Sequence, residues 1–463
     1  MRIIKVIISN EIVVFDPTEE LKEWCKKNLV VDNPEWDKKF RMKLWLGDTP
    51  EKLWLYKVDA GALILPFGIF KTIFPMICGT NIKVDFPETR KVDYKSTIEL
   101  FDYQKPAVDA LYASGMGILE SKAGSGKTQM GLALVAKHGC KTLWLTHTHD
   151  LLDQSRKRAA KYMDSSLFGE ITEGKVNVGK GITFATVQTL VKQDLSKFRE
   201  TWDCVIVDEC HRVCGSPTKF NQFGRVLSSL ACRYKYGLSA TVHRADGLTK
   251  CIFMYLGKIA YSVPDEAIAD KVMKVKIQKQ ETGTKIHPSC LDTDGTLIHS
   301  KLITYLAGNS RRNFHIINDL VENAEHYNLI LSDRLEHLRW LISAMPDELQ
   351  EQCVMIDGSM TSKKGKAERE QAIEDMRTGK KRYLFASYSL AKEGLDIPRL
   401  DRLYMATPVK DYAVVVQSVG RIARTFEGKS DPICYDYVDD IDYLKKAYTN
   451  HRCRHYRKSG CEV

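Results

Sequence analysis

Apolar runs of strand length alternate with helix-length segments along most of this chain. From about residue 93, the runs "GMGILE", "KTLWLTH", "GITFATVQTL" and "CVIVDE" alternate with small-residue loops and helix-like stretches such as "DLLDQSRKRAAKYM". Strands that alternate with helices are typical of a parallel, doubly wound sheet. We therefore predict an α/β domain over residues 93–263.

A second set of strand-like runs begins near residue 306. "NLILSD", "QCVMIDG", "RYLFASY" and "RLYMAT" have the composition of buried strands, and helix-length polar stretches separate them. This pattern predicts a second α/β domain over residues 306–448. The segment between the two domains, residues 264–305, is rich in Lys, Thr, Asp and Gly without a clear period, which indicates an extended linker or a small insertion.

Residues 1–92 have a different pattern, with the short β-like runs "RIIKVIIS", "KLWLYKV" and "GALILPFG". Four of the seven tryptophans lie there, at Trp24, Trp36, Trp45 and Trp54. We predict a small α+β domain in which most of these tryptophans belong to the core and one or two are exposed. An exposed ring could stack on an unpaired base or act as a wedge at a DNA junction.

The composition is that of a globular chain with more than one core. With 463 residues and 44% hydrophobic content, two or three domains are expected. No run approaches the roughly 18 apolar residues of a spanning helix, and polar Ser9, Asn10 and Glu11 interrupt the first apolar stretch. Thirteen cysteines without CxxC spacing indicate reduced thiols. We expect a cytosolic protein without disulfides or membrane contact.

The net charge of +10 is concentrated near the end of the chain, where residues 449–463 form a predicted basic tail. Such a tail suits a polyanionic partner, although it can also be a solvated end. His451, Cys453, His455 and Cys461 could hold zinc, but they lack the usual paired spacing of a structural zinc site, and both interpretations stay open.

The stretch "ESKAGSGKTQMG" lies between a strand-like run and a helix-like segment. Backbone N–H groups of small residues can converge on phosphate oxygens, and the helix N-terminus adds a positive dipole end. Lys127 would then reach the β and γ phosphates, and Thr128 could ligate Mg²⁺. A flexible turn before a helix is the alternative. The predicted phosphate loop consists of Ser121, Lys122, Ala123, Gly124, Ser125, Gly126, Lys127 and Thr128.

The run "CVIVDECHRV" places two carboxylates directly after an apolar strand. The carboxyl end of a strand in an α/β sheet is where ligands bind. Asp208 can hold Mg²⁺ there, and Glu209 can polarise an attacking water molecule. Together with the phosphate loop, this pair predicts hydrolysis of ATP with Mg²⁺.

The run "QSVGRIAR" spaces Gln417, Arg421 and Arg424 at i, i+4 and i+7, so one helical face can present two guanidinium groups. Arginines in a nucleotide cleft stabilise charge on the γ-phosphate. The local patterns predict Lys127, Asp208 and Glu209 as catalytic residues, and the resemblance of this run to motif six of the superfamily 2 helicases implies the same for Gln417, Arg421 and Arg424.

Asp208-Glu209-Cys210-His211 resembles the DExH box of superfamily 2 helicases, and further motifs of that family occur in order over residues 95–428. Tyr103-Gln104 resembles the glutamine motif that recognises adenine. "LSAT" is similar to the motif that couples hydrolysis to strand binding, and "ASYSLAKEGLDIP" and "QSVGRIAR" resemble motifs five and six. The resemblance implies two tandem RecA-like domains, parallel and doubly wound, behind a small α+β N-terminal domain.

The resemblance also implies residues outside the phosphate loop. "LTHTHDLLDQ" and "TVQTL" are similar to segments that grip the nucleic-acid backbone, where hydroxyl and amide groups donate to phosphates without reading bases. Without the family order these residues would be ordinary caps and turns. Nucleic-acid contact or coupling is implied for Thr146, Thr186, Gln188, His211, Ser239, Thr241, Arg244, Asp246, Thr361 and Ser387, and nucleotide contact for Tyr103, Gln104, Gly394 and Asp396.

The XPB-like group, which includes phage branch-migration helicases of the UvsW type, is the nearest form. In "SATVHRADGL", Arg244 and Asp246 resemble the Arg-Glu-Asp element that those enzymes use against duplex, with Ala245 in place of its Glu. The segment from Asn33 to Gly68 resembles the region ahead of the motor in small phage and bacterial members. Phe101 stands where an arginine often precedes the Tyr-Gln pair, and motif five has Ser387 in place of threonine.

This resemblance implies an ATP- and Mg²⁺-dependent DNA helicase that unwinds or branch-migrates forked and junction DNA without sequence preference. It also implies a DNA-engaging N-terminal domain and a monomer in a bacterial or phage-infected cytosol. The alternatives are a duplex translocase that does not separate strands, an RNA helicase, and a binding protein with a relic ATP site.

Overall fold

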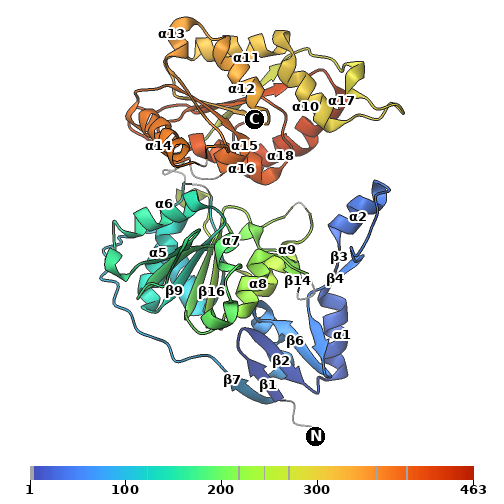
Figure 1. Cartoon of the computed structure of the whole chain (residues 1–463), viewed down its shortest axis with the longest axis vertical. Coiled ribbons are helices and arrows are strands. Elements are labelled where there is room, and N and C mark those ends of the chain that lie inside the picture. Colours follow the sequence, from blue (N-terminus) through green and yellow to red (C-terminus); the bar gives the residue numbers. More distant parts are fainter. Residues whose placement is uncertain are drawn as a thin grey trace. The chain divides into compact units, whose positions relative to one another are not determined.

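The computed structural model describes residues 5–122, 124–216, 219–244, 246–268, 272–360, 362–392 and 395–463 (Figure 1). The chain divides into two compact units. Unit 1 is Met1–Ser121 with Gly126–Pro264, and unit 2 is Lys122–Ser125 with Asp265–Val463. Each unit contains a largely or wholly parallel sheet, which confirms the predicted α/β class.

The N-terminal part of unit 1 has a sheet of its own, with strand order β5-β6-β2-β1-β7. Its neighbouring strands are antiparallel except for β1 and β7. In β2, "EIVVF", burial alternates, so that one face of the sheet is covered. The elements are β1 (Lys5–Ile8), β2 (Glu11–Phe15), α1 (Glu19–Asn28), β5 (Lys57–Asp59), β6 (Ala62–Pro66), η1 (Phe67–Ile69), α3 (Phe70–Ile77) and β7 (Asn81–Val84).

This N-terminal sheet shares one apolar core with the first large sheet. Gly68 in η1 lies so close to α9 (Thr249–Leu256) that an added Cβ would stand 2.3 Å from the Phe253 carbonyl oxygen. Lys235 is buried at the same junction, where its ammonium group donates to the Leu227 carbonyl at 2.9 Å and lies 5.1 Å from the Phe67 ring centroid. Burial lowers the pKa of Lys235 to about 8. The N-terminal region is therefore docked on the first large sheet.

The first large sheet has eight strands in the order β11-β10-β12-β9-β13-β16-β8-β17. Only β11 is antiparallel to its neighbour. Leu238 of β16 meets α5 at Gly131, whereas the adjacent Gly237 meets α9 at Leu256, so helices cover both faces.

The strands of this sheet are β8 (Met116–Glu120), β9 (Thr142–Thr146), β10 (Gly169–Thr172), β11 (Lys175–Asn177), β12 (Ile182–Thr186), β13 (Cys204–Asp208), β16 (Tyr234–Ser239) and β17 (Ile259–Ser262). Its other helices are α4 (Lys105–Ser114), α5 (Lys127–His138), α6 (His149–Ala159), α7 (Val187–Leu190) and α8 (Gln222–Ser229).

The sheet of unit 2 has six parallel strands in the order β18-β23-β22-β19-β21-β20. They are β18 (Lys276–Glu281), β19 (Asn328–Ser332), β20 (Cys353–Ile356), β21 (Tyr383–Ser387), β22 (Arg402–Met405) and β23 (Ile433–Val438). The helices include α10 (His299–Gly308), α11 (Ser310–Glu322), α12 (Leu335–Ser343), α13 (Asp347–Gln350), α14 (Lys363–Thr378), α15 (Tyr388–Lys392) and α16 (Tyr412–Ile422).

Two segments of unit 2 differ from the sequence expectation. Residues 264–305, expected as a linker or insertion, contain the edge strand β18, whose "KIQKQE" alternates in burial and lacks the continuous apolar run of a central strand. Residues 449–463, expected as a basic tail, contain a helix whose Arg452 and Tyr456 are buried. Both segments depend on partners far away in sequence.

His337 is a buried neutral histidine in the core of unit 2. One ring nitrogen, Nδ1, lies 3.0 Å from the Ser332 hydroxyl, and the other, Nε2, lies 3.0 Å from Asn313 Oδ1. Burial lowers the pKa of His337 to about 3, and the positive charge of Arg312 adds to this effect. Both hydrogen bonds are compatible with an uncharged ring that donates from Nε2.

The stability of unit 2 should therefore fall at acid pH. The unfolded histidine binds its proton near pH 6.5 and the folded one only near pH 3, so the contribution is complete above pH 6.5 and declines below it. We expect urea denaturation of wild type to lose about 1.5 kcal/mol more than His337→Gln between pH 6.5 and pH 5. Equal losses in both proteins would contradict this assignment.

Within the described parts of the chain, no helix combines the length and apolarity needed to cross a membrane. The same residues contain no group of three His, Cys, Asp or Glu side chains placed to hold a metal ion. Cys453, one of the four residues considered for zinc, is buried in the core of unit 2.

Candidate ATP site and nucleic-acid interface

The predicted phosphate loop joins β8 to α5, two elements of unit 1, and its residues Lys122–Ser125 are grouped with unit 2. Gly124 and Gly126 have φ angles of +86° and +81°, which glycine adopts without strain. Helix α5 begins at Lys127 without a side-chain cap, so its first N–H groups can serve an anion. Lys127 Nζ donates to the Ser121 carbonyl oxygen at 3.0 Å. Ala123 lies outside the described residues.

The glutamine motif lies against this loop. Gln104 is buried, and an added Cβ on Gly126 would stand 2.4 Å from its Nε2 atom. The same amide donates to the Tyr103 hydroxyl at 3.3 Å, and its Oε1 accepts from the Phe101 backbone N–H at 3.1 Å. The rings of Phe101 and Tyr103 stack at 5.8 Å, and half of Phe101 is exposed. The loop is thus flanked by an amide and an aromatic pair, groups that suit a nucleobase.

Asp208 ends β13 and Glu209 follows it, on the same edge of the sheet. Burial raises the pKa of Asp208 to about 7, and the adjacent Glu209 carboxylate adds to the rise, while the Lys127 ammonium opposes it. Asp208 accepts hydrogen bonds from Ser155 Oγ at 3.5 Å and from the Glu209 backbone N–H at 3.0 Å. Glu209 has a positive φ of 51°, a strained conformation for this residue type that is often kept at functional sites.

A polar chain connects Glu209 with the serine-alanine-threonine segment. His211 Nδ1 lies 3.2 Å from both Glu209 Oε2 and Ser239 Oγ. Ser239 Oγ in turn donates to the Thr241 carbonyl oxygen at 2.7 Å. Ser239 ends β16, the strand that lies between β8 and β13, and its carbonyl oxygen accepts from the Ser121 N–H at 3.0 Å. This segment therefore contacts the residues around both the phosphate loop and the Asp-Glu pair.

Arg244 extends this chain. Its guanidinium group forms a two-pronged ion pair with Asp246 and donates to the His211 carbonyl oxygen at 2.6 Å. Ala245, which lies between the paired residues, is outside the described residues. Because the charge of Arg244 is neutralised inside unit 1, its geometry suits coupling between segments better than a wedge against duplex.

The residues at this edge fit a magnesium nucleotide. Positive-φ glycines, an uncapped helix start and Lys127 are the groups that hold β and γ phosphates, and a buried carboxylate and a first-turn threonine on one edge of the sheet suit Mg²⁺. The burial that raises the pKa of Asp208 disfavours an isolated carboxylate, and a bound cation would offset that cost.

A polar groove of about 480 Å³ lies beside the ends of β9 and β12 in unit 1. Thr186 and Gln188 line it, and Gln188 Nε2 lies 2.7 Å from His147 Nδ1. Burial, followed by the charges of Arg212 and His211, lowers the pKa of His147 to about 4, so its neutral Nδ1 can accept that hydrogen bond at pH 7. The full lining is His147, Thr148, His149, Glu173, Gly174, Thr186, Gln188, Thr189, Lys192 and Gln193.

The residues that line the groove differ from the sequence prediction in two respects. Thr146 is completely buried and its hydroxyl donates to the Thr148 carbonyl oxygen at 3.1 Å, so it positions the groove wall instead of lining it. His147 and Lys192 line the groove although sequence reasoning did not single them out. The sequence signal that could have found them is their position: His147 comes directly after strand β9, and Lys192 comes shortly after the short helix α7.

The predicted residues of unit 2 gather at the ends of β21 and α16. Arg421 donates to the Leu395 carbonyl oxygen at 2.8 Å, and Arg424 forms an ion pair with Asp396. Gln417 is buried, and its Oε1 meets no donor among the residues that the structure describes. Ser387 Oγ lies 2.9 Å from Ser389 Oγ. Thr361 and Gly394 lie outside the described residues.

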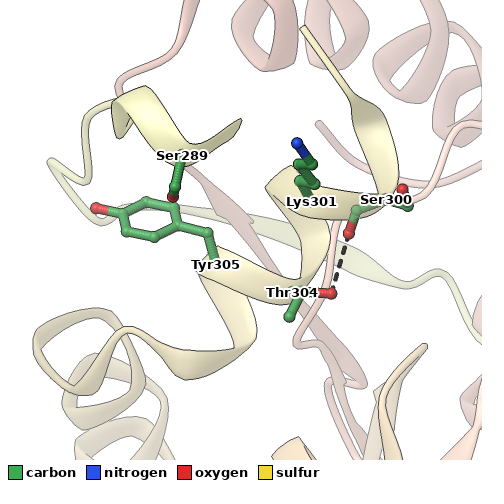
Figure 2. A pocket seen from close by; sticks show the side chains of 5 residues that line it. All are labelled: Ser289, Ser300, Lys301, Thr304 and Tyr305. Atoms are coloured by element: carbon green, nitrogen blue, oxygen red, sulfur yellow. Dashed lines mark hydrogen bonds between the residues drawn. The ribbon is translucent and has the colours of Figure 1, made fainter. Parts of the chain in front are cut away.

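Figure 2 shows a further pocket of about 370 Å³ in unit 2, which no predicted site residue lines. Thr304 donates to the Ser300 carbonyl oxygen at 3.0 Å within α10, and Arg334 donates to the same oxygen at 3.3 Å. The lining residues are Ser289, Ser300, Lys301, Thr304 and Tyr305.

An arm of unit 1, residues 30–54, leaves the N-terminal sheet as a two-stranded ribbon that carries a helix (Figure 1). Strand β3 (Val30–Asp32) pairs with β4 (Lys52–Trp54), and α2 (Pro34–Arg41) lies between them. Asn33 links the two strands at the base of the arm helix. Its side chain accepts from the Glu35 N–H at 3.1 Å and donates to the Pro50 carbonyl oxygen at 2.7 Å.

The arm tip, residues 38–46, exposes apolar and basic side chains together. Its sequence "KKFRMKLWL" contains four basic residues and no acidic one. Trp45 is 88% exposed, and Phe40, Met42 and Leu44 are each more than half exposed. Trp54 is also exposed, while Trp24 and Trp36 are partly buried. Clustered exposed apolar groups of this kind mark a binding surface.

Two protein families match the chain, one in each unit. Residues 97–244 match the family described as type III restriction enzyme, res subunit, and residues 312–426 match the family described as helicase conserved C-terminal domain. The chain belongs to the superfamily 2 helicases. This helicase is ATP-dependent and has two tandem RecA-like domains, which confirms the predicted family, enzyme class and fold.

Relatives of this helicase come from viruses and bacteria. Probable helicase D10 of Escherichia phage T5 is 25% identical over 94% of this chain and 90% of its own length. Putative ATP-dependent RNA helicase L396 of Acanthamoeba polyphaga mimivirus is 28% identical over 73% of this chain and 63% of its own length. DNA 3'-5' helicase XPB of Mycobacterium tuberculosis is 25% identical over 78% of this chain and 64% of its own length.

Proposed function

We propose that this helicase uses ATP hydrolysis to unwind or branch-migrate forked and junction DNA. The arm tip is the observation that carries this proposal. An exposed indole flanked by cationic side chains suits an unpaired base and its phosphates, which become accessible where a duplex opens. The relative named DNA 3'-5' helicase XPB supports DNA as the substrate.

We assign roles in ATP binding and hydrolysis to the residues around β8, α5 and β13. The loop Ser121–Thr128 would hold the phosphates, with Lys127 at the β and γ groups, while Tyr103 and Gln104 would contact adenine. Asp208 and Thr128 would hold Mg²⁺, which would supply positive charge against the charge that develops on the phosphates during hydrolysis. Glu209, at the start of the chain through His211 to Ser239, would orient the attacking water.

The coupling residues follow from the same contacts. His211, Ser239, Thr241, Arg244 and Asp246 form one connected set, so a change at Glu209 on hydrolysis would reach the segment after β16. We assign to this set the transfer of the hydrolysis signal toward bound nucleic acid.

The backbone contacts are assigned to the groove of unit 1 and to motif residues of unit 2. Thr186 and Gln188 line the groove directly, and Thr146 supports it. Thr361 and Ser387 are the proposed contacts of unit 2. Hydroxyl and amide groups bind phosphates without reading bases, so binding should be independent of sequence.

We also propose that the γ-phosphate is stabilised during hydrolysis by Gln417, Arg421 and Arg424. Gly394 and Asp396 are the proposed nucleotide contacts. The ion pair between Arg424 and Asp396 supports a shared role for these two residues.

RNA unwinding is the second candidate, because one relative is named a putative ATP-dependent RNA helicase. Hydrolysis and strand separation should be measured with single-stranded DNA, duplex DNA, a fork, a four-way junction and RNA, with Glu209→Gln as the inactive control. Stimulation by forked or four-way DNA with separated or migrated strands is expected. Stimulation by RNA alone would favour the second candidate, and hydrolysis on duplex without strand separation would indicate a translocase.

Replacing Trp45 should weaken unwinding while leaving hydrolysis intact. Stacking on a base contributes about 1–3 kcal/mol, so we expect Trp45→Ala to slow fork unwinding by about tenfold, with ATP hydrolysis on duplex DNA unchanged. Phe74→Ala removes another exposed ring of the N-terminal region and serves as the control, which should unwind like wild type. If both variants unwound forks at the same rate, the arm tip would have no role in unwinding.

A further inference from the structure

The last helix of unit 2 is anchored in the core through Asp436. This carboxylate lies in β23 and accepts from Arg452 and from the Tyr456 hydroxyl, each at 2.7 Å. The three side chains are buried. Breaking a buried pair of this kind is strongly destabilising because it leaves an unpaired buried charge, so the helix has a defined place on the domain.

This helix displays most of its charge outward. It runs through α17 (Asp442–Ala447), the π-helical turn η7 (Tyr448–Arg452) and α18 (Cys453–Lys458). Lys446, Arg454 and Arg457 are exposed, and none of them has an ion pair within the described residues. Lys445 is paired with Asp440. At the α-helical rise of 1.5 Å per residue, Lys446 and Arg457 lie at most about 16 Å apart along the axis, because the π-helical turn between them is shorter.

The aromatic rings near this face already have lysine or histidine side chains as partners. Lys410 Nζ lies 3.7 Å from the Tyr443 ring centroid. Tyr412 has His455 at 4.9 Å on one side, and the Lys458 ammonium group lies 5.1 Å from its centroid. Surfaces for single strands combine cations with free rings on which bases stack, whereas the partly exposed Tyr443 ring beside this face already carries the Lys410 ammonium group.

We infer that the face formed by Lys446, Arg454 and Arg457 binds the phosphate backbone of duplex DNA. The inference rests on the proposed function, because it takes DNA as the substrate. Duplex DNA presents regularly spaced phosphates over the length of this face, which is at most about 16 Å, without any need to stack bases. The arm tip and this face therefore have different targets: the arm tip binds unpaired bases, and this face binds the paired region.

The C-terminal helix packs against α16, so a duplex bound to this face would be connected to that helix. Tyr412 begins α16, the helix that carries Arg421, and His455 of α18 packs on its ring. A duplex bound to the face is thereby connected through packed side chains to the helix of motif six.

The test removes the three charges together, as Lys446→Gln, Arg454→Gln and Arg457→Gln in the full chain. Binding is measured without nucleotide on a blunt duplex of about 30 base pairs and on oligothymidine of similar length, over a range of salt. We expect the duplex Kd to rise about tenfold or more near 0.1 M salt, with the log Kd against log salt slope smaller by about 2–3. Oligothymidine binding should stay within about twofold.

The control variant removes three charges elsewhere in unit 2, from the exposed Arg339 and Lys380 and the half-buried Lys381, as Arg339→Gln, Lys380→Gln and Lys381→Gln, and should bind both ligands like wild type. Unchanged duplex binding by the test variant, or equal weakening for both ligands, would overturn the inference. Failure of the proposed function looks different, since wild type would then bind duplex DNA but unwind no fork.

Discussion

Glu209→Gln is expected to reduce ATP hydrolysis by about 10²–10⁴-fold while ATP affinity stays close to that of wild type. The carboxylate follows a buried strand and lies 3.2 Å from His211 Nδ1, in a backbone conformation that its neighbours hold against strain. Glutamine keeps the size and one oxygen of the side chain but cannot accept a proton from water. Steady-state hydrolysis and titration with a fluorescent ATP analogue would separate the two effects.

Glu23→Gln is the matched control, because Glu23 is an exposed carboxylate on α1 that pairs only with Lys26 in the described structure. It should hydrolyse ATP like wild type. A Glu209→Gln variant that retained most of its activity would require another base. A variant that lost ATP affinity as well would place Glu209 among the binding groups.

Lys127→Ala should abolish measurable hydrolysis by weakening nucleotide binding itself. A charge-assisted hydrogen bond contributes about 1.5–3 kcal/mol, so we expect ATP affinity to fall by roughly 10–150-fold. In the structure the ammonium group donates to the Ser121 carbonyl oxygen and lies close enough to Asp208 to oppose the rise in its pKa. Alanine removes the only side-chain charge at the start of α5.

Lys137→Ala tests a lysine at the other end of the same helix, where the side chain pairs with Asp109 on the surface. Its ATP affinity and hydrolysis should match those of wild type. If Lys127→Ala bound ATP normally and hydrolysed it at the wild-type rate, the phosphate loop would have no catalytic role and the relic-site alternative would gain support.

Much of the candidate ATP site could be predicted because its parts are local. A strand, a glycine-rich loop and a helix start follow one another within a few residues, and Asp208 comes directly after an unbroken apolar run. The groove was harder to predict, since His147 and Gln188 meet across 41 positions of sequence. The same holds for Thr146, whose hydroxyl type suggested contact with phosphate but whose complete burial assigns it to the groove wall.

The sequence by itself determined the two α/β domains, the order of the helicase motifs and the residues of the candidate phosphate loop, because short-range patterns of apolar, small and charged residues specify these features. Only the tertiary structure decided that β18 joins the second sheet, that Arg244 is neutralised by Asp246, that Trp45 is exposed and that the basic end of the chain is a helix held by Asp436. Each of these features depends on burial and on the positions of neighbouring groups after folding, which the local pattern does not contain.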